Sequence, residues 1–223
     1  MEKESLIKRY LIFIAGLYFL ALGVVLIVRS TLGTTPISSL NYVLSLNTSL
    51  SLGTCTFIVN LLMIIIQFWL VRGKYGDRKD RMEIFLQIPL SFVFSAFIDW
   101  NMLMTASLHP VNYQMSLGIL LAGCITQAIG VVLELKPMVA MMSAEGMVKY
   151  IARRNGKKFG NVKVFVDITL VLTAAIVSVV MSGKIEGIRE GSVISACITG
   201  YIVNFLNYRI MTRRMLKRLL PIR

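Results

Sequence analysis

The sequence predicts an all-α polytopic membrane protein with about six transmembrane helices, arranged as two inverted three-helix repeats that each have an extra short helix. Three observations lead to this fold class: the lengths of the apolar runs, the positions of the basic residues and an internal repeat. In this prediction residues 1–223 form a single transmembrane domain. The first repeat covers about 8–104 and the second about 115–210.

The apolar runs are the first observation. Hydrophobic residues make up 56% of the chain and charged residues only 16%. A soluble helical domain rarely has this composition, because its helices keep one face in water. The first run has no small-residue cleavage site followed by a soluble domain, so we interpret it as a retained helix and not as a signal peptide. The runs that approach the roughly 17–25 residues needed to cross a bilayer are 8–29, 54–72, 83–104, 115–134, 161–182 and 191–210.

The basic residues fall between these runs. Of the 24 Lys and Arg residues, 20 lie in the segments 1–9, 72–82, 134–160 and 209–223. The positive-inside rule places those segments, and therefore both termini, in the cytoplasm. A net charge of +13 would suggest nucleic acid in a soluble protein. Because the charge lies in connectors, we expect the lipid bilayer and a small solute as partners, with a second copy of the chain as an option and no nucleic acid.

An internal repeat is the third observation. The hexapeptide at 21–26 matches the one at 128–133 at an offset of 107 residues. The same offset aligns Gly16 with Gly123 and Asn60 with Asp167, without a gap from residue 16 to about 71. If each repeat crosses the membrane three times, the second repeat starts on the opposite side from the first. The repeat is then inverted, an architecture that recurs in transporters.

Two segments between the long runs, 35–47 and 138–153, are too short to span a bilayer and are predicted to be interfacial or re-entrant helices. Thr35 is the expected N-cap of the first and Pro36 its first helical residue. Such a helix start favours anions, and Arg29 would add to its field. The alternative is a capped connector with Arg29 extending to the outer headgroups.

Polar residues within or beside the apolar helices are the candidate site, because such residues usually face the bundle interior. The alternative for Asp167 is an interhelical hydrogen bond or an ion pair with Lys163, one helical turn away. The candidate substrate-binding residues are Thr34, Thr35, Ser38, Asn60, Gln127, Ser143, Glu145 and Asp167. The candidate charge-bearing residues are Arg29, Asp99 and Lys136.

Catalytic chemistry is not expected. The three cysteines, Cys55, Cys124 and Cys197, have no metal-ligand spacing, and His109 is the single histidine. No nucleophile elbow or phosphate-binding loop is present in the sequence. We therefore expect no enzyme, no metal and no cofactor.

One stretch of the sequence carries a resemblance to a known family. It runs from Arg29 through Leu32-Gly33-Thr34-Thr35-Pro36 to Ser39, and Leu52-Gly53-Thr54 follows it. With Gln87-Ile88-Pro89 and Ile98-Asp99, this pattern resembles the bacterial YitT/YczE/YyaS group of membrane proteins over most of the chain. The resemblance implies a multi-pass protein of the bacterial cytoplasmic membrane and a candidate transporter. It implies no substrate and no catalytic residue.

These observations favour a small secondary transporter or exporter of a small solute, with an anion as one option, that works by alternating access. Two alternatives stay open. One is a non-transporting scaffold or sensor in the membrane, and the other is a substrate-capturing subunit of a larger importer.

Overall fold

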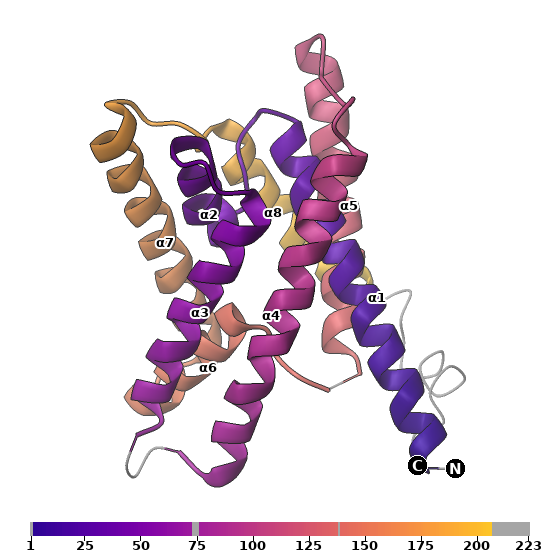
Figure 1. Cartoon of the computed structure of the whole chain (residues 1–223), viewed down its shortest axis with the longest axis vertical. Coiled ribbons are helices and arrows are strands. Elements are labelled where there is room, and N and C mark those ends of the chain that lie inside the picture. Colours follow the sequence, from indigo (N-terminus) through magenta and orange to yellow (C-terminus); the bar gives the residue numbers. More distant parts are fainter. Residues whose placement is uncertain (1, 73–75, 138, 207–223) are drawn as a thin grey trace.

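The structure is a computed structural model that describes residues 2–72, 76–137 and 139–206. The described residues form eight helices and no strand (Figure 1). The helices are α1 (Glu2–Arg29), α2 (Pro36–Asn47), α3 (Leu52–Leu70), α4 (Arg78–Met104), α5 (Tyr113–Leu135), α6 (Ser143–Asn155), α7 (Phe159–Ser182) and α8 (Glu190–Phe205).

Five helices are long and apolar enough to cross a membrane: α1 from Ile7 onward, α3, α4, α5 and α7. The sixth expected span, 191–210, corresponds to α8, a shorter apolar helix whose predicted last residues, 207–210, lie outside the described residues. The basic segment 209–223 lies outside them as well. The prediction of an all-α polytopic membrane protein is confirmed.

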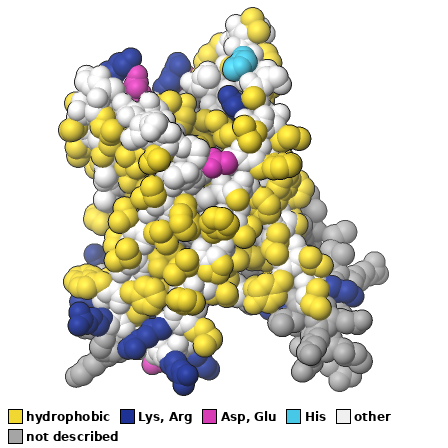
Figure 2. All heavy atoms as spheres, viewed as in Figure 1, with side chains coloured by type: hydrophobic (Ala, Val, Ile, Leu, Met, Phe, Trp, Pro, Cys, Tyr) yellow, Lys and Arg dark blue, Asp and Glu magenta, His cyan; other side chains and the backbone are white. Residues whose placement is uncertain are grey.

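Large apolar side chains cover the outside of the spans. Phe85, Phe92, Phe165 and Ile176 are each more than 60% exposed. Figure 2 shows hydrophobic side chains across the middle of one face of the molecule, with Lys and Arg at its two ends. A water-soluble protein seldom exposes so large a contiguous apolar surface, whereas hydrocarbon solvates it without cost.

The connections divide between the two ends of the molecule. The α3–α4 connection and the start of α7 lie at the lower end in Figure 1, and the α4–α5 and α7–α8 connections lie at the upper end. We call the lower end the basic end, because Arg78, Lys79, Arg153, Lys157 and Lys158 lie there. The upper end is called the opposite end.

The helices α1 and α5 pack closely and run antiparallel. A Cβ on Gly16 would meet the backbone of Glu134, and one on Gly23 would meet the backbone of Gln127, so residue numbers rise in α1 as they fall in α5. The contacts of the aligned glycines are equivalent. A Cβ on Gly123 would meet Ile27, and one on Gly130 would meet Leu20. Ile27 and Leu20 precede Glu134 and Gln127 by the 107 residues of the sequence repeat.

The order and packing of the helices follow the same correspondence. α2 and α6 begin at Pro36 and Ser143, and α3 and α7 begin at Leu52 and Phe159; the residues of each pair are 107 positions apart. α1 packs on α4 as α5 packs on α8, and α2 packs on α7 as α3 packs on α6. One pair differs: α3 packs along α4, whereas the described parts of α7 and α8 scarcely meet.

The two short helices begin differently. α2 begins as predicted, with Thr35 as its extended N-cap and Pro36 in its first turn. The predicted start of the second segment, at 138, is wrong, because α6 begins at Ser143. The Gln67 side chain donates a 3.0 Å hydrogen bond to the Ser143 carbonyl and exchanges hydrogen bonds with Gln87. These buried amides, on α3 and α4, hold the first turn of α6.

Candidate functional site

A cavity of about 730 Å³ lies between the two halves of the chain. It is lined by all eight helices and by the first turns of both short helices, α2 and α6. Its lining extends to Leu135 and Phe159, which lie near the basic end and are each more than 40% exposed. We call it the central cavity.

Seven of the eight candidate substrate-binding residues line the central cavity: Thr35, Ser38, Asn60, Gln127, Ser143, Glu145 and Asp167. They come from five helices and the N-cap of α2, so the fold gathers residues that are up to 132 positions apart. The eighth, Thr34, is fully buried beside the start of α8, where its backbone N–H donates a hydrogen bond to Ser192 Oγ. Its placement holds the α1–α2 connector against α8.

Several polar atoms in the cavity wall have no protein partner. They include Oδ1 of Asn41 and Nδ2 of Asn60, whose residues are only 3% and 6% exposed. Gln127 Oε1, Asp167 Oδ1 and Thr199 Oγ1 are unpartnered as well. A buried polar atom without a hydrogen bond costs about 1–3 kcal/mol. The cavity is therefore built to hold something that makes these bonds, either water or a polar solute.

Three charged side chains line the cavity in the described residues: Glu145, Lys163 and Asp167. Lys163 Nζ lies 3.5 Å from Asp167 Oδ2, so the predicted ion pair one helical turn apart is present. The other carboxylate oxygen of Asp167 stays unpartnered. Burial raises the pKa of Glu145, and the nearby Lys163 ammonium acts in the opposite direction.

The three charge-bearing candidates lie outside the central cavity. Asp99 accepts hydrogen bonds from Ser51 Oγ at 2.7 Å and from the Gly53 N–H at 2.8 Å, so it caps the start of α3 from α4. Lys136 is the C-cap residue of α5. Arg29 donates to the Met102 carbonyl at 2.7 Å, at the opposite end of the molecule.

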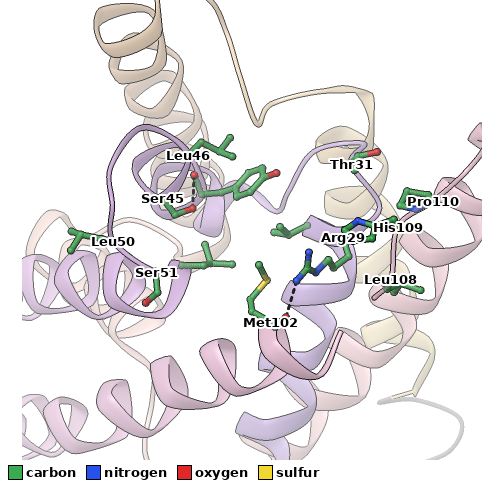
Figure 3. Close-up of a pocket in the computed structure, with 13 residues that line it drawn as sticks. Arg29, Thr31, Ser45, Leu46, Leu50, Ser51, Met102, Leu108, His109 and Pro110 are labelled. Atoms are coloured by element: carbon green, nitrogen blue, oxygen red, sulfur yellow. Dashed lines mark hydrogen bonds between the residues drawn. The ribbon is translucent and has the colours of Figure 1, made fainter. Parts of the chain in front are cut away.

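Arg29 lines a second pocket, of about 410 Å³, which we call the outer pocket. Figure 3 shows Arg29 and His109 on one side of it and Ser45 of α2 on the other, with the Arg29–Met102 hydrogen bond between α1 and α4. The outer pocket and the central cavity share no lining residue. They are two separate spaces on the same helices.

The two spaces are one helical turn apart. Val28 of α1, Tyr42 of α2 and Leu52 of α3 line the outer pocket, and the residues four positions away, Val24, Ser38 and Thr56, line the central cavity. Val28 and Leu52 pack into one apolar cluster with Phe94, and Tyr42 packs against it. A single turn of α-helix is about 5.4 Å long. This apolar layer, formed by Val28, Tyr42, Leu52 and Phe94, closes the central cavity toward the opposite end.

Some cavity residues were not singled out from the sequence as site residues. Asn41 lies in the polar segment that begins α2, and only its helical spacing from Ser38, three positions earlier, could have indicated it. Thr199 and Lys163 lie on α8 and α7, and the sequence indicated Lys163 only as a partner of Asp167. No group of three His, Cys, Asp or Glu side chains able to hold a metal is found in the described part of the chain.

Comparison with known proteins gives one match. Residues 7–208 match a family described as "Family of unknown function (DUF6198)". No curated protein and no solved structure matches the chain. The matched range includes every helix that lines the central cavity.

Proposed function

The chain belongs to the DUF6198 family, and we propose that it is a small secondary transporter or exporter of a small solute that works by alternating access. The main support is the central cavity. It is enclosed by helices of a polytopic membrane protein, and its wall contains polar atoms without partners. Sites of this kind, near the middle of the membrane and between related halves, are typical of secondary transporters. The resemblance to the YitT/YczE/YyaS group stays a prediction.

An internal two-fold axis is part of the proposal. The antiparallel packing of α1 on α5, with equivalent glycine contacts, supports two repeats that face the membrane in opposite directions. The exchanged packing partners of the other helices support the same relation. Two similar halves around one cavity can give two states of similar energy, each open to one side.

The packing difference between the halves supports a state open toward the basic end. α3 packs along α4 near the apolar layer, whereas α7 and α8 scarcely meet over their described parts, and the cavity reaches Phe159. In the other state, α7 and α8 would pack together and α3 would separate from α4. The apolar layer would then open and join the central cavity to the outer pocket.

The orientation in the membrane follows from the positive-inside rule. If the basic end is cytoplasmic, as we propose, the present state is open to the cytoplasm and the Arg29 pocket faces outward. The location proposed is the bacterial cytoplasmic membrane. The residue that suggested an anionic solute, Arg29, lies outside the central cavity, so the proposal does not include an anion.

Access to a cysteine in the cavity tests the proposal. Ala196 lines the cavity, is small and is exposed. In a variant without Cys55, Cys124 and Cys197, Ala196→Cys would be treated with a small membrane-impermeant thiol reagent from each side of sealed vesicles. Alternating access predicts modification from both sides.

A control and a contrary result make this test decisive. A Glu186→Cys variant, in the α7–α8 connection at the opposite end, reports vesicle orientation because it is modified from one side only. If Ala196→Cys also reacts from one side only, the cavity does not alternate. A membrane scaffold, a sensor or a capturing subunit would then explain the protein better.

A further inference from the structure

We infer that the solute held by the central cavity is an amphipathic organic amine, with an apolar body and a protonated nitrogen that bears N–H donors. The inference rests on the proposed function for the role of the cavity, but its test does not require transport. Three properties of the wall support it: the sign of its charge, the excess of hydrogen-bond acceptors and the apolar remainder.

The charge of the wall is negative. Glu145 and Asp167 are its two carboxyl groups, and Lys163 is its one cation among the described lining residues. A third carboxyl group, Glu134, is 3% exposed and lies close enough to Glu145 to interact with it. Glu134 Oε1 has no partner. One ammonium therefore faces more than one carboxylate, and a bound cation would balance the charge.

Most of the unpartnered polar atoms are acceptors. Asn41 Oδ1, Gln127 Oε1 and Asp167 Oδ1 all require a donor. Asn60 Nδ2 is the one unpartnered nitrogen of the wall, since Asn60 Oδ1 already accepts a 2.7 Å hydrogen bond from Ser143 Oγ. A ligand that supplies several N–H groups satisfies this set better than a carboxylate or a phosphate, which would supply none.

The rest of the wall is apolar. It includes Leu20, Val24, Ile37, Phe94, Val131 and Val203. A volume of about 730 Å³ falls within the range of sites for small organic molecules. A simple inorganic cation would leave this apolar surface unfilled. The cavity fits a molecule with an aromatic or aliphatic body and an amine at one end.

The test compares two probes of the same size and opposite charge, 1-naphthylmethylamine and 1-naphthaleneacetate. Binding to the full chain in lipid nanodiscs would be measured by titration calorimetry, with empty nanodiscs as the blank. We expect the amine to bind and the carboxylate to bind at least tenfold more weakly. Because a hydrogen bond to a charged group is lost, Asp167→Asn and Glu145→Gln should each weaken amine binding by about ten- to a hundredfold.

Lys163→Gln gives a prediction of opposite sign. Removing the ammonium frees the Asp167 carboxylate, so this variant should bind the amine more tightly than the unchanged chain. Glu186→Gln, whose carboxylate pairs with Lys184 outside the cavity, is the matched control and should leave binding unchanged. Each variant would first be shown to be monodisperse and to unfold at the same temperature as the unchanged chain.

Two results would overturn the inference. One is amine binding that is absent, or that Asp167→Asn and Glu145→Gln do not change. The other is preferential binding of the carboxylate, weakened by Lys163→Gln, which would make the cavity an anion site. Neither result affects the Ala196→Cys accessibility test, so an error in the ligand class can be told apart from an error in the proposed function.

Discussion

Asp99 and Asp167 are both carboxylates in apolar helices, and the structure gives them different surroundings. Both oxygens of Asp99 accept hydrogen bonds from the start of α3. Asp167 is paired with Lys163 through one oxygen only, and its other oxygen faces no donor. The sequence could place both residues in helices but could not separate their roles, because the partners of Asp99 lie 46 and 48 residues away.

Asp99→Ala tests the capping role. The change removes both hydrogen bonds at the start of α3, where backbone N–H groups lack helical partners. A lost helix cap costs about 1–2 kcal/mol, which for a chain of this size corresponds to a decrease of roughly 2–8 °C in the unfolding midpoint. Tryptophan fluorescence during heating in detergent would measure it. Asp99→Asn keeps one acceptor and should lose less, whereas an unchanged midpoint for Asp99→Ala would contradict the role.

The candidate site was predictable in part because polar residues in apolar helices have few places to go. Asn60, Gln127 and Asp167 were selected for that reason alone, and all three line the same cavity. Asn41 was missed because it lies in a short helix that is polar throughout its first turns. Arg29 has a local sequence context like that of a site residue, but its bond to Met102 depends on how α1 meets α4.

At the scale of helices, local chemistry predicted one short helix better than the other. Thr35 and Pro36 set the start of α2 within the sequence itself. α6 begins at Ser143, five residues later than predicted, because amides of α3 and α4 bind its first turn. Contacts made only in the folded chain set that boundary, and no local pattern could show it.

The α1–α5 contact leads to a prediction about glycine. A Cβ on Gly23 would lie 2.5 Å from the Gln127 backbone nitrogen, and one on Gly130 would meet the Leu20 backbone. Backbone atoms cannot move aside, so Gly23→Ala and Gly130→Ala should each destabilise the protein by about 1–3 kcal/mol. The loss would be measured as a lower unfolding midpoint in detergent.

Gly118→Ala is the matched control for these variants. Gly118 also lies in α5, but nothing lies within 4 Å of its would-be Cβ. Alanine is the better helix former by about 0.5–1 kcal/mol, so this variant should be as stable as the unchanged chain or slightly more stable. Equal effects at Gly23 and Gly118 would show that α1 and α5 do not pack as described.

At the scale of the whole molecule, composition and charge were sufficient for the fold class. Runs of apolar residues predicted the spans, since hydrocarbon admits helices of that length and little else. The positions of the helices around a shared cavity were not predictable, because lipid-facing and cavity-facing sides look alike in a run such as 164–181. The sequence offset of 107 residues suggested which helices correspond, but only the structure gives their contacts.

The account depends on two halves that cross the membrane in opposite directions, and cysteine accessibility measures this directly. Single cysteines would replace Lys79, His109, Asn155 and Glu186 in a variant without native cysteines, and sealed vesicles of known orientation would be labelled with an impermeant maleimide. We expect positions 79 and 155 to react only from the cytoplasmic side and positions 109 and 186 only from the outside. If positions 79 and 155 react from opposite sides, α6 crosses the membrane and the inverted arrangement is wrong.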